Sequence, residues 1–266
     1  MVNKNVIGLH KQTIIGMVHC LPLPGSARFA NNMEVIKQQA INDAITLEKA
    51  GCDAIIVENM GDGPFSVLLE PEQAAALTVV ATLVKERVSI PVGIDAAFSD
   101  YRVSLSIAKA MGASFIRIPV YVDTVMFYGG VINPCAHETL LFRKKLQAED
   151  VLILADIHVK HTFMVNPLIT IEDSAKMAAS AGADAIIVTG AAIGKETPTD
   201  IIERVKKVVS IPVLAGSGVK PSNIKAQLAI ADGAIIGSSL KIDGIISNPI
   251  DYELTKQVVD ALRRGI

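Results

Sequence analysis

Seven polar residues stand at or just beyond the ends of short β-branched segments, and their types suit proton-transfer chemistry. Burying such groups without partners would cost several kcal/mol each, so we expect their side chains to meet one another or a ligand. Functional side chains of barrel enzymes gather at the carboxyl ends of the strands. The predicted site residues are His19, Glu58, Asp95, Arg117, Asp156, His158 and Lys160.

The densest of these groups is Asp156-x-His158-x-Lys160-His161. His158 suits a general acid or base near neutral pH. Lys160 could form a Schiff base if it is desolvated, or it could neutralise substrate charge. Asp156 could orient either neighbour.

Two other interpretations of the same residues stay open. Arg117 could bridge Asp95 and Asp156 in a structural ion-pair network. Alternatively, a divalent cation could be held by carboxylate and imidazole ligands, drawn from Glu58, Asp95, Asp156 and His158.

Two glycine–serine turns predict an anion site. Barrels often bind phosphate in the loops after their last two strands, where glycine lets main-chain N–H groups come close. The simpler interpretation is that these glycines only turn the chain. We expect phosphate binding by Gly216, Ser217, Gly218, Gly237, Ser238 and Ser239, with Lys241 adding a charge.

Internal repetition indicates how these residues are positioned. Ala50-Gly51-Cys52-Asp53-Ala54-Ile55-Ile56-Val57 recurs as Ala181-Gly182-Ala183-Asp184-Ala185-Ile186-Ile187-Val188, and Ser89-Ile90-Pro91-Val92 recurs as Ser210-Ile211-Pro212-Val213. Each repeat ends a helical pattern with glycine and continues into a short β-branched segment. The offset is close to half the chain, which predicts two similar half-barrels.

Alternating strand and helix patterns predict a single (β/α)8 barrel over residues 1–266. Open dinucleotide-binding sheets typically carry a G-x-G-x-x-G turn after their first strand, and this sequence has no such motif after the first predicted strand. Strands are expected at 13–20, 53–59, 92–97, 114–121, 151–158, 184–190, 213–218 and 233–240. Helices are expected at 33–50, 71–87, 100–112, 137–148, 171–182, 199–209, 222–231 and 249–264.

The segment 122–136 after the fourth strand interrupts this alternation without a clear helix. It contains Phe127-Tyr128-Gly129-Gly130. It is predicted either to cover the mouth of the barrel as a lid or to be a plain surface excursion.

Composition excludes several classes of protein. The net charge is −2 and basic residues are dispersed, which argues against nucleic-acid binding. The 3 cysteines form no C-x-x-C pair. No apolar stretch is long enough to span a membrane, and residues 1–12 lack the apolar core of a signal peptide. We expect a soluble cytoplasmic protein, and the sequence leaves a homo-oligomer open.

Three motifs resemble those of the BtpA/SgcQ family. They are Gly16-Met17-Val18-His19-Cys20-Leu21-Pro22-Leu23-Pro24-Gly25-Ser26, Glu58-Asn59-Met60-Gly61-Asp62-Gly63-Pro64-Phe65 and Leu154-Ala155-Asp156-Ile157-His158-Val159-Lys160-His161. The similarity covers nearly the whole chain. One departure is Gly93-Ile94-Asp95-Ala96-Ala97-Phe98-Ser99-Asp100, where many relatives carry Asn-Val-Leu-Arg-Asn-Asp.

The resemblance implies a barrel of the ribulose-phosphate-binding type and supplies no defined reaction. Our leading hypothesis is an enzyme of the isomerase, epimerase or aldolase type that acts on a phosphorylated sugar or similar metabolite. FMN is the alternative cofactor, because the same turns bind its phosphate in related barrels. A non-catalytic assembly factor for photosystem I-type complexes is the third hypothesis.

Overall fold

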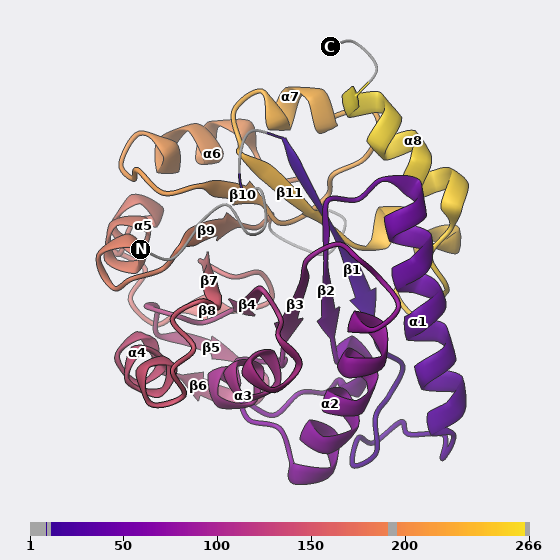
Figure 1. The fold of residues 1–266 in the computed structure, drawn as a ribbon. Helices are drawn as coiled ribbons and strands as arrows, with labels where there is room; N and C mark the ends of the chain where they lie inside the picture. The colour runs from indigo at the N-terminus through magenta and orange to yellow at the C-terminus, as the bar shows by residue number, and fades with distance from the viewer. Residues whose placement is uncertain (1–8, 10–11, 191–195, 264–266) are drawn as a thin grey trace.

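Eight parallel strands close into a barrel, as predicted (Figure 1). The computed structural model describes residues 9, 12–190 and 196–263. The hydrogen-bonded order around the barrel is β1-β11-β10-β9-β7-β4-β3-β2. The barrel strands are β1 (Thr13–His19), β2 (Ala54–Glu58), β3 (Val92–Asp95), β4 (Phe115–Ile118), β7 (Leu152–Ile157), β9 (Ala185–Val188), β10 (Val213–Ala215) and β11 (Gly233–Ile236).

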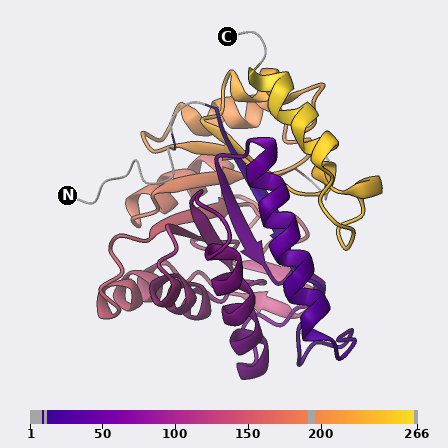
Figure 2. The ribbon, with the colours of Figure 1, turned by 45° about the vertical axis from the view of Figure 1, so that its right-hand side comes forward.

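Helices surround the barrel, and α8 packs beside α1 to complete the ring (Figure 2). The described α-helices are α1 (Met33–Ala50), α2 (Pro71–Lys85), α3 (Tyr101–Met111), α4 (Ala136–Lys145), α5 (Ile171–Ser180), α6 (Thr199–Lys206), α7 (Ile224–Leu228) and α8 (Tyr252–Arg263). Short 3-10 turns are η1 (Met60–Asp62), η2 (Ser238–Leu240) and η3 (Ile242–Gly244). Within the described residues, no helix is both long and apolar enough to cross a bilayer.

Local sequence signals explain the best-predicted helix ends. The side chain of Asn32 accepts a hydrogen bond from the Val35 N–H at the start of α1, and Gly51 ends that helix with a left-handed φ of 103°. Thr170 and Asp173 form a capping box at the start of α5. Helix α7 is shorter than the predicted 222–231.

The strand pattern divides the core into two layers. Ile56 packs with Phe115 and Leu154 in one cluster, whereas its neighbours Ile55 and Val57 belong to the larger cluster that includes the helices. Alternation along β2 therefore directs Ile56 inside the barrel, as predicted.

The sequence repeat has a physical counterpart at the amino-terminal ends of the strands. The carboxylate of Asp53 accepts a hydrogen bond from the Ile14 N–H at 2.7 Å, and the Asp53 N–H donates to the Ile14 carbonyl. These two hydrogen bonds join the residue just before β2 to the beginning of the neighbouring strand β1, which explains why aspartate recurs at this position of the repeat. The same two bonds join Asp184 to Ile153 and Asp232 to Val213.

The segment after β4 forms a small second sheet. Strand β5 (Val125–Phe127) pairs antiparallel with β6 (Gly130–Ile132) and with β8 (Phe163–Met164). The β5–β6 hairpin falls within the predicted insertion, whereas β8 follows the fifth barrel strand and was not predicted. A covering role for this sheet stays a prediction.

We expect Asp184→Ala to lower the free energy of unfolding by about 1–3 kcal/mol, because it leaves the buried Ile153 N–H without this acceptor. Asp184→Asn keeps an oxygen at the same place and should cost much less. Urea unfolding of the two variants measures the difference. Equal losses would show that the hydrogen bond does not stabilise the strand start.

Candidate functional site

A cavity opens at the carboxyl ends of the barrel strands, with about 110 Å³ available to the centres of water molecules. Its lining brings together acid–base groups from one half of the barrel and the two glycine–serine turns from the other. Of the predicted site residues it includes His19, Glu58, Asp95, Arg117, Lys160, Gly216, Ser217, Gly218, Gly237, Ser238 and Ser239.

Two predicted acid–base residues are not among those that line the cavity. Asp156 is 1% exposed and holds Arg117 through two hydrogen bonds, from Nε to Oδ1 at 2.8 Å and from Nη2 to Oδ2 at 2.9 Å. His158 has a left-handed φ of 46°, and its backbone N–H donates to Asp123. Strand β7 ends at Ile157, so the alternation that would direct His158 into the barrel does not extend to this residue.

Tyr121 falls within the predicted strand 114–121, in which alternation would place it on the same face as Arg117, but the structure places it elsewhere. Strand β4 ends at Ile118, and the Tyr121 side chain packs in the outer cluster. Its hydroxyl donates to the Ala181 carbonyl at 2.7 Å. Tyr121 therefore joins β4 to the end of α5 and is absent from the cavity lining.

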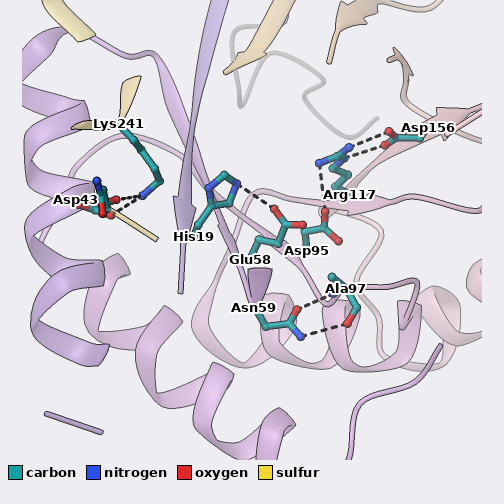
Figure 3. A network of polar contacts seen from close by, with 10 residues as sticks. His19, Asp43, Glu58, Asn59, Asp95, Ala97, Arg117, Asp156 and Lys241 are labelled. Carbon is teal, nitrogen blue, oxygen red and sulfur yellow. Dashed lines mark hydrogen bonds and ion pairs between the residues drawn. The ribbon is translucent and has the colours of Figure 1, made fainter. Parts of the chain in front are cut away.

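The predicted network of Asp95, Arg117 and Asp156 is present (Figure 3). Arg117 Nη1 lies 3.5 Å from Asp95 Oδ2, and neither Asp95 oxygen has a hydrogen-bond partner among the described residues. Burial, together with the charge of Glu58, raises the pKa of Asp95 well above its ordinary value, although Arg117 opposes this. Asp95 is thus a buried carboxyl that favours its protonated form.

The pKa of Glu58 is shifted in the opposite direction to that of Asp95. Burial alone would raise the pKa of Glu58, but the hydrogen bond and charge of His19, assisted by Arg117, outweigh burial and lower it. His19 Nε2 lies 3.3 Å from Glu58 Oε2. The cavity therefore holds one carboxyl that favours the ionised form beside one that favours the neutral form.

Lys160 lines the cavity from the segment that follows β7. Its backbone N–H donates to Thr189 Oγ1 at 3.1 Å, which fixes the main chain there. Burial and the charge of Arg117 lower the pKa of Lys160, against the opposing charges of the nearby carboxylates. Burial and Lys160 also lower the pKa of His161, which lines the cavity as well.

The two turns differ in what they offer an anion. The Gly216 N–H donates to the Val188 carbonyl at 2.8 Å, so it is not available to a ligand. A Cβ on Gly216 would lie 2.6 Å from Ile187, so this glycine is needed for strand packing. Within the two turns, the described main-chain N–H groups of Gly218, Gly237, Ser238 and Ser239 donate to no other backbone carbonyl.

The prediction that Lys241 adds charge to the anion site is wrong. Its side chain is fully buried, with Nζ 3.2 Å from Asp43 Oδ2 and 2.8 Å from the Asn248 carbonyl. This pair lies on the other side of β1 from His19 (Figure 3). Lys241 therefore anchors the segment after η2 to α1.

The donor set does not fit the proposed divalent cation. Among the described residues, no three His, Cys, Asp or Glu side chains are arranged to hold a metal ion. The guanidinium of Arg117 lies between Asp95 and Asp156, where a shared cation would have to sit. His158 does not line the cavity.

The sequence interpretation missed the apolar wall of the cavity, formed by Met60, Phe65, Phe98 and Val159. Phe98 stacks on Phe127 of β5 with ring centroids 4.9 Å apart. Apolar residues after strands resemble core residues in sequence. The only available signal was their position directly beyond predicted strand ends.

The first two family-like motifs meet at a buried carboxylate. Asp62 accepts hydrogen bonds from the Leu23 N–H, from Asn59 Nδ2 and from Gln73 Nε2. Asn59 also bonds both the N–H and the carbonyl of Ala97. These contacts fix the loops after β1, β2 and β3, so most of these motif residues support the cavity without lining it.

A model of the BtpA family matches residues 10–264. The chain belongs to the BtpA family. It is 45% identical to a Pyrococcus furiosus protein over 250 residues, covering 94% of each chain. It is 35% identical to the photosystem I biogenesis protein BtpA of a Synechocystis species over 258 residues, covering 95% of this chain and 88% of that protein.

Solved structures similar to this BtpA-family chain are barrel enzymes of low sequence identity. One is (S)-3-O-geranylgeranylglyceryl phosphate synthase from Thermoplasma acidophilum in complex with sn-glycerol-1-phosphate, with a TM-score of 0.60, 18% identity and coverage of 96% of this chain and 94% of that chain. Another is a mutant tryptophan synthase α-subunit from Pyrococcus furiosus, with a TM-score of 0.60, 15% identity and coverage of 97% and 99%. These similarities establish the fold.

We expect Asp156→Asn and Asp95→Asn to have opposite effects on stability. Removing the Asp156 charge breaks a buried pair and should cost about 3–5 kcal/mol. Asp95 binds its proton more tightly in the folded state, so its contribution to stability falls as pH rises from about 3.9 to the raised pKa. Asp95→Asn should therefore gain stability relative to the parent chain across that window.

Denaturant unfolding at several pH values between 4 and 8 measures both effects. Asp100→Asn is a poor control because it caps α3, whereas Asp150→Asn changes the same charge at an exposed loop. A stability difference between Asp95→Asn and the parent chain that does not change with pH would contradict the raised pKa.

Proposed function

We propose that the cavity binds the phosphate of a phosphorylated small molecule and catalyses proton transfer beside its carbonyl group. The observation that supports this most directly is a pair of turns, at Gly218 and over Gly237–Ser239, that line the same cavity as the acid–base groups and whose main-chain N–H groups donate to no other backbone carbonyl. Main-chain N–H donors are suited to phosphate oxygens. A structural neighbour holds sn-glycerol-1-phosphate on the same fold.

Opposite protonation preferences assign the roles of the two carboxyls. Glu58, which favours ionisation, would accept the proton from the carbon beside the carbonyl. Asp95, which favours its neutral form, would donate a proton or hydrogen bond to the carbonyl oxygen. Arg117, held by Asp156, would limit the charge that develops on the bound substrate.

This assignment replaces the expected roles of Asp156 and His158. Both oxygens of Asp156 accept hydrogen bonds from Arg117, so Asp156 acts as its support, while His158 is absent from the cavity lining. His19 and Lys160 remain in contact with the cavity. The reaction classes that fit are isomerisation, epimerisation and aldol-type cleavage.

A second candidate function is a non-catalytic role in the assembly of a protein complex. The specific observation in its favour is the 35% identity to a relative named photosystem I biogenesis protein BtpA. That role requires no acid–base pair in the cavity. Neutralising Glu58 would then leave function intact in cells.

We expect inorganic phosphate, phosphorylated sugars or FMN to raise the melting temperature, because a ligand at 100 times its Kd adds about 2.7 kcal/mol of stability. Ser238→Asp should abolish the shift by placing a carboxylate in the turn. Ser247→Asp adds the same charge at an exposed residue outside the cavity lining and should keep the shift. The measurement is the melting temperature of each variant with and without each ligand. Equal ligand-induced shifts in both variants would contradict phosphate binding at the turn that contains Ser238.

We expect Glu58→Gln to slow proton abstraction by about 10²-fold or more, the usual contribution of a general base. The measurement is deuterium incorporation from D₂O into dihydroxyacetone phosphate, followed by NMR. The phosphate-induced thermal shift should survive in this variant, and Glu34→Gln on the exposed face of α1 serves as the control. Undiminished exchange in Glu58→Gln would remove this residue from the mechanism.

A further inference from the structure

The half-buried ammonium group of Lys160 differs from that of the buried Lys241 in having no hydrogen-bond or ion-pair partner among the described residues. Lys241 is bonded to Asp43 and to a main-chain carbonyl. The ammonium group of Lys160 makes no hydrogen bond and no close ion pair with any residue that the structure describes. A half-buried ammonium without a partner is costly, which indicates that the group is kept for a ligand.

The position of Lys160 suits attack on a bound molecule. The hydrogen bond from its N–H to Thr189 fixes the main chain immediately beyond β7. The side chain lines the cavity that Gly218 and Ser238 also line. A phosphorylated molecule held by those turns would therefore lie in the same enclosed space as the Lys160 amine.

The surroundings favour the neutral amine, which is the nucleophilic form. Burial and the fixed positive charge of Arg117 both lower the pKa of Lys160. Asp156 keeps that guanidinium in place. The nearby Asp95 favours its protonated form, so it can supply a proton.

We propose that Lys160 is a catalytic residue that forms a Schiff base with the carbonyl carbon of a phosphorylated ketone or aldehyde. The inference rests on the proposed function and adds a covalent step to it. The Nζ lone pair forms the C–N bond as the C=O π bond breaks, and one proton moves from the nitrogen to the oxygen to give a neutral carbinolamine. Asp95 then protonates the hydroxyl group, which leaves as water, and an iminium ion remains.

The iminium carbon would draw electrons from the adjacent C–H or C–C bond, and Glu58 would take the released proton. The overall exchange consumes one amine and one carbonyl and releases one water molecule. It requires no oxidant, reductant or metal ion. A Schiff base at Lys160 narrows the proposed reaction classes to those that proceed through an enamine.

The test is borohydride trapping on the whole chain. Dihydroxyacetone phosphate and pyridoxal 5′-phosphate, a ketone and an aldehyde that both carry phosphate, are incubated with the protein and reduced. Peptide mapping by mass spectrometry then locates the label. Because a lowered pKa increases the neutral fraction of the amine near neutral pH, Lys160 should carry more label than any exposed lysine.

The matched variants are Lys160→Arg, which keeps the charge but removes the amine, and Lys176→Arg on the exposed face of α5. Label lost in the first and kept in the second supports the proposal, as does competition by inorganic phosphate. Label spread over exposed lysines, or no label, overturns it. Because the peptide map of the parent chain decides the point, poor folding of Lys160→Arg does not leave it open.

The same experiment separates this inference from the proposed function. No label on Lys160 while dihydroxyacetone phosphate still raises the melting temperature would overturn the Schiff base and leave phosphate binding standing. Label on Lys160 without competition by phosphate would support the reactive lysine and count against the phosphate site.

Discussion

The bidentate ion pair between Arg117 and Asp156 determines how the carboxyl groups at the mouth of the barrel are compensated. Because Asp156 satisfies the guanidinium with bonds of 2.8 and 2.9 Å, Arg117 meets Asp95 only at 3.5 Å. Asp95 is therefore buried without full compensation and favours its proton. Glu58, one strand away, is compensated by His19 and favours its charge. The pKa values of two carboxyls on adjacent strands are thus shifted in opposite directions before any ligand arrives.

This arrangement depends on rigid elements. Arg117 and Asp156 lie in the neighbouring strands β4 and β7, whose register pairs Arg117 with Leu154. Side chains packed in the strand layer have little freedom to relax. The distance between Arg117 and Asp156 is therefore fixed by the two strands. The cavity's apolar wall is built differently, from Phe65 and Phe98 in loops that Asp62 and Asn59 hold. The strands therefore position the network of carboxyls and Arg117, and the loops position the apolar wall.

The sequence was sufficient for the barrel and for much of its mouth. Periodicity and glycine caps are local signals, so α1 was predicted to the residue and the inward direction of Glu58 followed from alternation. Prediction failed where the chain leaves regular structure. His158 adopts a left-handed backbone, and Lys241 follows a short 3-10 turn, so strand alternation no longer applies to either. The pairing of β5 with β8 joins residues far apart in sequence, which no local pattern reveals.

Gly237 illustrates why the site cannot be interpreted residue by residue. Its φ of −119° is not in the left-handed region that favours glycine, so the need for a glycine here comes from the space around it. A Cβ there would lie 2.9 Å from His19 Cε1, closer than atoms normally approach. A side chain there would displace the imidazole, and with it the group that compensates the buried charge of Glu58. The absence of a side chain at Gly237 therefore supports the ionised carboxylate on β2, although β11 and β2 are separated by β1.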